Sequence, residues 1–280
     1  MGTSTSDLSP DPLGPDADLS PPAERPPRPS WSYAPATYVL VGINCLVFLV
    51  MLARGVSWWN PTPDQLLYFG ADHAGAVLIH GEWRRIVTAM FVHVGILHLA
   101  TNMWCLWNLG LLAEPLMGSA GMVAVYILTG AAGNLLSTLY NWLWPIRDTT
   151  GFGFPVGAGA SGAVFGIAGA LIILLKSHRL PVPALELRKL RRSVIYFAAI
   201  NLGIGLFISL RVVERHTGVS VDNSAHLGGF LCGLLFAVPM VPRIGSERTL
   251  FVQKLRMAVM MVVGILVLLG FYLTHVRPPS

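Results

Sequence analysis

Four polar side chains stand in otherwise apolar stretches of the sequence, and together they have the chemistry of acyl transfer. Ser161 lies in the small-residue run GAGASGAVFG, and His226 lies in DNSAHLGGF. A serine hydroxyl becomes a nucleophile when a neighbouring imidazole takes its proton. His98 and Asn102 stand at i, i+4, so both can point toward the oxyanion that forms when a carbonyl is attacked. This combination of residue types indicates peptide hydrolysis.

The composition places these residues in a membrane. Hydrophobic residues make up 54% of the 280 and charged residues 12%, whereas a soluble domain has about 25% charged residues. Segments near the roughly 20 apolar residues that a span requires are 36–53, 96–113, 120–141, 160–175, 194–210, 224–241 and 257–275. We therefore predict an all-α polytopic membrane helix bundle. Its three cysteines fall in apolar stretches, where they are expected to pack as small hydrophobic residues.

The chain divides into three parts by composition. Residues 1–35 contain nine prolines and are predicted to be a disordered cytoplasmic tail. Residues 36–241 hold the first six spans, and residues 242–280 hold an inner loop, the seventh span and a short outer tail. With the N-terminus inside, the inner connections carry 12 of the 19 lysines and arginines. This asymmetry predicts a cytoplasmic N-terminus and an extracytoplasmic C-terminus, and it explains the charge of +5 without nucleic-acid binding.

The four polar residues fall at one depth. Counted from the inner ends of their helices at 1.5 Å per residue, Ser161 lies at about 22 Å, His98 and His226 at about 24 Å, and Asn102 at about 18 Å. Polar groups within a bilayer are costly and indicate function by default. Taken singly, a serine or an asparagine is more often a hydrogen-bonding contact between helices. Their coincidence in depth on three helices favours a site.

Glycines at a spacing of four predict how these helices meet. Gly162 and Gly166 form one small-xxx-small face, and Gly229 and Gly233 form another on nearly the same face as His226. Backbones that meet through such faces come close enough for a serine at one helix start to reach a histidine on the other.

Other chemistries fit these residues less well. The run GASG lacks the second glycine of the G-x-S-x-G elbow, because residue 163 is alanine. His93 and His98 stand at i, i+5 and lack the H-E-x-x-H arrangement of a zinc site. A haem held between histidines would leave Ser161 unexplained. We expect neither a metal nor a cofactor.

The motifs, taken in order, resemble those of the rhomboid intramembrane serine proteases. They are GEWRR at 81–85, HVGILHLATN at 93–102, Glu114 with Gly118, GASG at 159–162 and DNSAHLGGFLCG at 222–233. The resemblance covers residues 36–241 and implies a six-helix rhomboid core, here followed by one additional C-terminal transmembrane helix.

The resemblance also implies roles for individual residues. Ser161 is the expected nucleophile and His226 the general base, with His98 and Asn102 stabilising the oxyanion. The supporting residues that it implies are Gly159, Gly162, Phe165, Gly229, Gly233, His93, Trp83, Arg84 and Glu114. Among them His93 is expected to support the active-site loop, Trp83 and Arg84 belong to the long first loop, and Glu114 is expected to tether a loop by a hydrogen bond.

Two positions need separate interpretation. Phe165 stands where many rhomboids have tyrosine, and it is expected to stack on His226 without donating a hydrogen bond. Asp222 stands four residues before His226, where capping of the helix start, with Asn223 or Ser224, is favoured over membership of a triad.

The expected function is endopeptidase cleavage of membrane-anchored protein substrates near the outer face of a bilayer. By resemblance the substrate helix enters laterally, near the second and fifth spans, with the loop 211–223 capping the site. A bacterial inner membrane is expected, since no organelle-targeting presequence is seen.

The main alternative is a non-catalytic rhomboid-like protein that binds or escorts transmembrane helices. A proton or ion transporter is disfavoured because no charged residue interrupts the spans.

Overall fold

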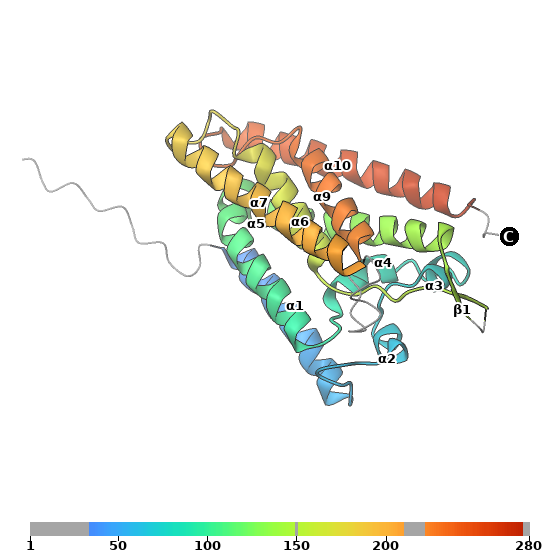
Figure 1. Ribbon diagram of the computed structural model, residues 1–280. Helices are drawn as coiled ribbons and strands as arrows, with labels where there is room; N and C mark the ends of the chain where they lie inside the picture. Colours follow the sequence, from blue (N-terminus) through green and yellow to red (C-terminus); the bar gives the residue numbers. More distant parts are fainter. Residues whose placement is uncertain (1–33, 149–150, 210–221, 277–280) are drawn as a thin grey trace, which may run out of the picture. The chain divides into compact units, whose positions relative to one another are not determined.

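Helices make up nearly all of the regular structure. The computed structural model describes residues 34–148, 151–209 and 222–276. Its elements, in chain order (Figure 1), are α1 Pro35–Ala53, α2 Pro63–Tyr68, α3 Ala74–Leu78, α4 Arg85–Thr88, the 3₁₀ helix η2 Ala89–Phe91, α5 Ile96–Leu143, β1 Ile146–Asp148, β2 Gly151–Gly153, α6 Ser161–Leu174, α7 Ala184–Ser209, α9 Asn223–Ala237 and α10 Arg248–Leu273. The proline-rich residues 1–33 and most of the loop expected to cap the site lie outside the described residues.

Four of the described helices, α1, α5, α7 and α10, are long and apolar enough to cross a bilayer. Helices α6 and α9 are apolar but have only 14 and 15 residues. At 1.5 Å per residue they reach about 21 to 23 Å, which is shorter than a hydrocarbon core of about 30 Å. The chain is therefore an integral, multi-pass membrane protein, and the helices that carry Ser161 and His226 are shorter than the four candidate spans of the described residues.

Helix α5 contains both of the spans predicted at 96–113 and 120–141. Its 48 residues are interrupted at Gly118, whose φ of 68° and ψ of 163° are not helical. Glycine adopts a positive φ without steric penalty, and Pro115 just before it removes a backbone donor. The two predicted spans thus correspond to two helices that meet at a kink at Gly118.

Helices α7 and α10 begin before their predicted spans, at Ala184 and Arg248 rather than at 194 and 257. Lysine and arginine are good helix formers, so each helix continues through the basic segment that precedes its apolar run. The short helices of residues 63–91 and the antiparallel pair of β1 and β2, with Ile146 opposite Gly153, were not predicted either. Their apolar patterns are too short to be distinguished from loops.

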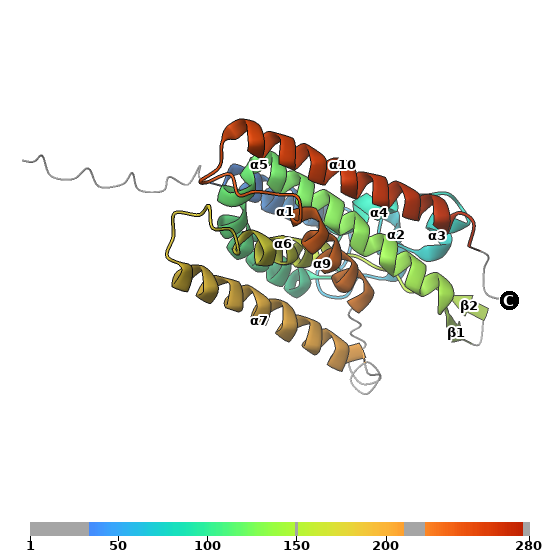
Figure 2. The same cartoon turned by 90° about the horizontal axis from the view of Figure 1, so that it is seen from above.

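Helices α5, α6 and α9 each contact the other two, while α7 contacts α6 and α9 at one edge (Figure 2). Helix α10 runs beside α5 on the other side and also contacts α9. Helix α1 packs against α5. The central layer is therefore formed by α5, α6 and α9.

The contact between α6 and α9 is made by backbone. A methyl group added at Gly229 would overlap the carbonyl oxygen of Gly162, and one added at Gly233 would overlap that of Gly166. The sequence prediction that these glycine faces meet is confirmed. Helices this close exclude side chains from the line of contact.

Glu114 joins the start of α1 to the two sides of the Gly118 break. Its carboxylate is 2% exposed and accepts hydrogen bonds from the backbone N–H groups of Ala36 and Thr37, at 3.0 and 2.8 Å. It also accepts from the hydroxyl of Ser119, at 2.7 Å, across the Gly118 break. The expected loop-tethering hydrogen bond is present, and the same carboxylate satisfies the first free amides of α1.

A methyl group added at the α6–α9 contact tests whether close backbone packing stabilises the fold. We expect Gly233→Ala to lower the free energy of unfolding by about 1–3 kcal/mol, because overpacking forces the two backbones apart. The matched control is Gly264→Ala on α10, where an added methyl group meets no atom within 4 Å and alanine favours the helix by about 1 kcal/mol. Thermal unfolding in detergent micelles measures both. Equal melting temperatures for the two variants would contradict the packing argument.

Candidate active site

Ser161 is the first residue of α6 and is half-buried. Two residues earlier, Gly159 has a φ of 128°, and a methyl group added there would lie 2.5 Å from Cε1 of His98. Only glycine combines this backbone conformation with space for the imidazole. The structure therefore brings His98, in the first turn of α5, against the segment that leads into Ser161.

His226 lies in the first turn of α9 and is 8% exposed. The ring of Phe165, from the second turn of α6, stacks on its imidazole with a centroid distance of 4.4 Å and an interplanar angle of 17°. The predicted stacking is confirmed. Phe165 covers one face of the imidazole without donating a hydrogen bond to it.

The residues that follow Ser161 and precede His226 in the sequence, Gly162 and Ala225, lie against each other. The carbonyl oxygen of Ala225 lies 3.3 Å from the position of a methyl group added at Gly162. Within the described residues no hydrogen bond joins the two side chains, and Nδ1 of His226 is buried without a partner. The two helix starts are thus brought side by side, with one ring nitrogen unpaired.

The other residues of the H-x₄-H-x₃-N motif surround the same segment. His93 is fully buried, lies 5.3 Å from His98 between ring centroids, and its Nε2 accepts a 3.5 Å hydrogen bond from the N–H of Ala160. This hydrogen bond joins His93 to the loop before Ser161. Asn102 donates from Nδ2 to the carbonyl of His98, at 2.9 Å, which leaves its second amide hydrogen for another acceptor.

In the first loop, residues 54–95 between α1 and α5, the arginine that bonds to the loop backbone is Arg85 and not Arg84. The side chain of Arg84 is 67% exposed and pairs with Glu82, at 2.9 Å. Arg85 is buried and donates from Nη1 to the carbonyls of Leu67 and Ala71, at 2.7 and 2.9 Å. Adjacent arginines look alike in sequence, and only the fold shows which one points inward.

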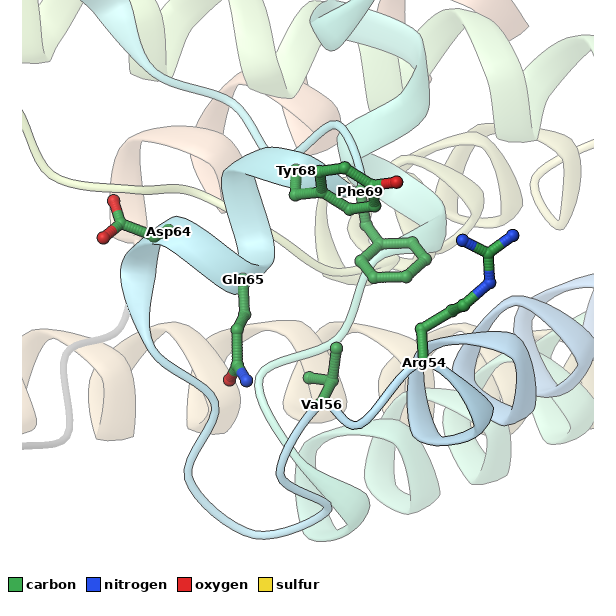
Figure 3. A pocket seen from close by; sticks show the side chains of 6 residues that line it. All are labelled: Arg54, Val56, Asp64, Gln65, Tyr68 and Phe69. Carbon is green, nitrogen blue, oxygen red and sulfur yellow. The ribbon is translucent and has the colours of Figure 1, made fainter.

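Trp83 is half-buried and contacts α10, where its ring lies 3.8 Å from the position of a methyl group added at Gly270. It also lines an apolar cavity of about 500 Å³ between the first loop, α5 and α10. A second cavity, of about 350 Å³, lies between the end of α1 and α2 (Figure 3) and is lined by Arg54, Val56, Asp64, Gln65, Tyr68 and Phe69. Neither set of lining residues includes Ser161 or His226.

Asp222 caps α9, so the preference for helix capping over a triad is confirmed. Its Oδ1 accepts from the backbone N–H of Ala225, at 3.0 Å, and from the hydroxyl of Ser224, at 2.5 Å. Its Oδ2 accepts from the hydroxyl of Ser137 on α5. Because Nδ1 of His226 has no partner within the described residues, this nitrogen makes no hydrogen bond to the carboxylate.

Sequence reasoning missed Asp72, a second carboxylate beside this cap. Asp72 is 2% exposed, and both of its oxygens accept from the Thr138 hydroxyl, at 3.1 and 3.0 Å. Its backbone pairs with Gly157 through two hydrogen bonds of 2.7 and 2.9 Å. Asp72 therefore links the first loop, α5 and the strand-like segment that enters α6. An isolated aspartate in a polar loop carries no sequence signal for such a position.

These features define a class: a polytopic helical membrane protein with a histidine-rich polar site at the start of short central helices. Comparison with known proteins then identifies the family, because the rhomboid domain matches residues 80–243. The chain belongs to the rhomboid family. Its motifs from GEWRR to AHLGG all fall within the matched region.

Several curated relatives are similar along much of the chain. Rhomboid protease GluP of Bacillus subtilis is 30% identical over 87% of this chain, and rhomboid protease AarA of Providencia stuartii is 28% identical over 73%. RHOMBOID-like protein 6, mitochondrial, of Arabidopsis thaliana is 31% identical over 67%. The aligned part spans 41% of GluP, 72% of AarA and 54% of the Arabidopsis protein.

The Asp72 carboxyl lies in the loop between the first two spans, and burial raises its pKa from 3.8 to about 7. The hydrogen bond from Thr138 opposes this rise, and the nearby carboxylate of Asp222 adds to it. Between the two pKa values the unfolded chain binds fewer protons than the folded chain. Stability therefore falls as the pH rises through this window.

We expect Asp72→Asn to flatten this dependence, because an amide keeps the side-chain volume and does not ionise. Melting temperatures measured in micelles from about pH 4 to about pH 7 should fall less steeply for the variant than for the wild type. Asp64→Asn, at an exposed aspartate in the first turn of α2, is the matched control and should keep the wild-type slope. An unchanged slope in Asp72→Asn would show that this carboxyl is already ionised across the range.

Proposed function

We propose that this protein is an intramembrane serine endopeptidase in which Ser161 is the nucleophile and His226 the general base. The observation that supports this most directly is the backbone contact of α6 with α9. Gly162, next to Ser161, meets Gly229 of α9 and lies beside the carbonyl of Ala225, next to His226. An imidazole at this position can take the hydroxyl proton and later pass it to the leaving amine. Water then hydrolyses the acyl-enzyme.

The oxyanion is stabilised by His98, Asn102 and the backbone N–H of Ser161. The contact of His98 with Gly159 supports this role, because it directs the imidazole toward the residues just before the serine. The Ser161 N–H belongs to the first turn of α6, where amides lack helical acceptors and favour negative charge. Donors fixed before the reaction need little rearrangement as charge develops.

Phe165 orients the base. Stacking at 4.4 Å holds the plane of the His226 ring, so that a ring nitrogen stays directed at the serine. In this chain Phe165 holds the plane of the ring by stacking, without the phenolic hydroxyl that tyrosine supplies.

The proposed architecture is a six-helix core over residues 36–241 followed by α10 as a seventh span. The two halves of α5, together with α1, α6, α7, α9 and α10, provide the seven segments. The N-terminus is inside, and cleavage takes place near the outer face, in substrates that are membrane-anchored proteins. The bacterial relatives GluP and AarA support a bacterial inner membrane as the location.

Cleavage of a model transmembrane substrate in proteoliposomes tests this function. We expect Ser161→Ala and His226→Ala each to lower the cleavage rate by at least about 10³-fold, as removal of a nucleophile or its base does in serine proteases. Ser193→Ala removes an exposed hydroxyl on α7 and should leave the rate unchanged.

Labelling by a fluorophosphonate provides the second readout. The wild type should be labelled and the Ser161→Ala variant should not. Equal labelling of the two would refute the assignment of the nucleophile. A wild type that neither labels nor cleaves any of a panel of substrates would favour the alternative, a protein that binds or escorts transmembrane helices without cutting them.

A further inference from the structure

Asp222 holds the first turn of α9 with both its side chain and its backbone. Its carboxylate accepts from the N–H of Ala225 and the hydroxyl of Ser224. Its carbonyl oxygen accepts from the backbone N–H of His226, at 3.2 Å. The carbonyl bond to His226 is the first i→i−4 bond of the helix, and the carboxylate satisfies the Ala225 amide, which is one of the free amides at the helix start.

The same carboxylate is anchored to a different helix. Oδ2 of Asp222 accepts from Ser137 of α5, which is 1% exposed. The Ser137 oxygen in turn accepts from Nδ2 of Asn141, at 3.2 Å. One turn before Ser137, Gly133 lies against the carbonyl of Ala225 so closely that an added methyl group would be 2.6 Å from it. The start of α9 is thus fixed on α5 by a hydrogen bond and by a backbone contact.

We propose that Asp222 is a positioning residue, which holds the first turn of α9 against α5 so that the His226 imidazole faces Ser161. The inference rests on the proposed function, since it assigns a purpose to the orientation of the base. Asp222 acts through the backbone and through Ser137, because Nδ1 of His226 makes no hydrogen bond to it. Phe165 fixes the plane of the ring, and Asp222 fixes the position of the backbone that carries the ring.

Removal of this anchor should affect the chemical step more than substrate binding. Displacement of a catalytic group by about 1 Å can lower the rate by about 10²-fold, so we expect Asp222→Ala to reduce kcat by roughly 10- to 100-fold with KM changed less than about 2-fold. Asp222→Asn keeps an acceptor for the Ala225 amide and a group that can bond to Ser137. It should restore kcat to within about 3-fold of the wild type.

The experiment measures kcat and KM in proteoliposomes for the wild type, Asp222→Ala, Asp222→Asn and Ser137→Ala, with melting temperatures for each. Thr62→Ala is the matched control, because Thr62 caps α2 in the same way, accepting from the Gln65 amide at 3.3 Å. It should lower stability without lowering kcat. Ser137→Ala leaves the helix cap in place and removes only the anchor, so a reduced kcat is expected there even if Asp222→Ala does not fold.

The proposal is overturned if Asp222→Ala or Ser137→Ala retains the wild-type kcat, or if Asp222→Asn loses as much kcat as Asp222→Ala. A loss in Thr62→Ala equal to that in Asp222→Ala would also overturn it, by showing a general effect of stability. Failure of the proposed function is recognised separately, because the wild type would then show neither cleavage nor fluorophosphonate labelling.

Discussion

The contact of α6 with α9 through glycine is the constraint on which the rest of the site depends. Within a bilayer, apolar side chains gain little by leaving lipid for one another, so helices associate through close packing and hydrogen bonds. At Gly229 and Gly233 the packing is so close that a single methyl group would overlap a carbonyl of the facing helix. This separation sets how near the residues at the two helix starts can be. Ser161 and His226 occupy those starts.

Hydrogen bonds made by polar residues hold the helix starts and loops around the site in place. Asp222 caps α9, Asp72 joins the first loop to the segment before Ser161, and Arg85 binds two carbonyls of the first loop. Each satisfies groups that would otherwise be buried without partners, which is costly where water is excluded. The site therefore lies at the starts of two short helices, and residues of the neighbouring loops and of α5 help to fix the positions of these helix starts.

The sequence predicted the helical class, the approximate positions of the apolar helices and the meeting of the two glycine faces. These features have strong local signals, because hydropathy and spacing are properties of neighbouring residues. The helix starts at Ala184 and Arg248 were missed, since hydropathy marks where a chain enters lipid and not where its helix begins. Asp72 and Arg85 were missed for a different reason: their partners lie 66 and 14 to 18 residues away. No local pattern distinguishes them from exposed charged residues such as Asp64 and Arg84.

The capping of α1 by Glu114 has a consequence for biosynthesis. The backbone amides of Ala36 and Thr37 find their acceptor on a residue 78 and 77 positions later. While the chain emerges from the ribosome, the first helix enters the bilayer before this carboxylate has been made. The free amides at its N-terminal end need water or headgroups as partners until the second span is inserted. Completion of the first helix is thereby coupled to translation of the segment that ends at the Gly118 break.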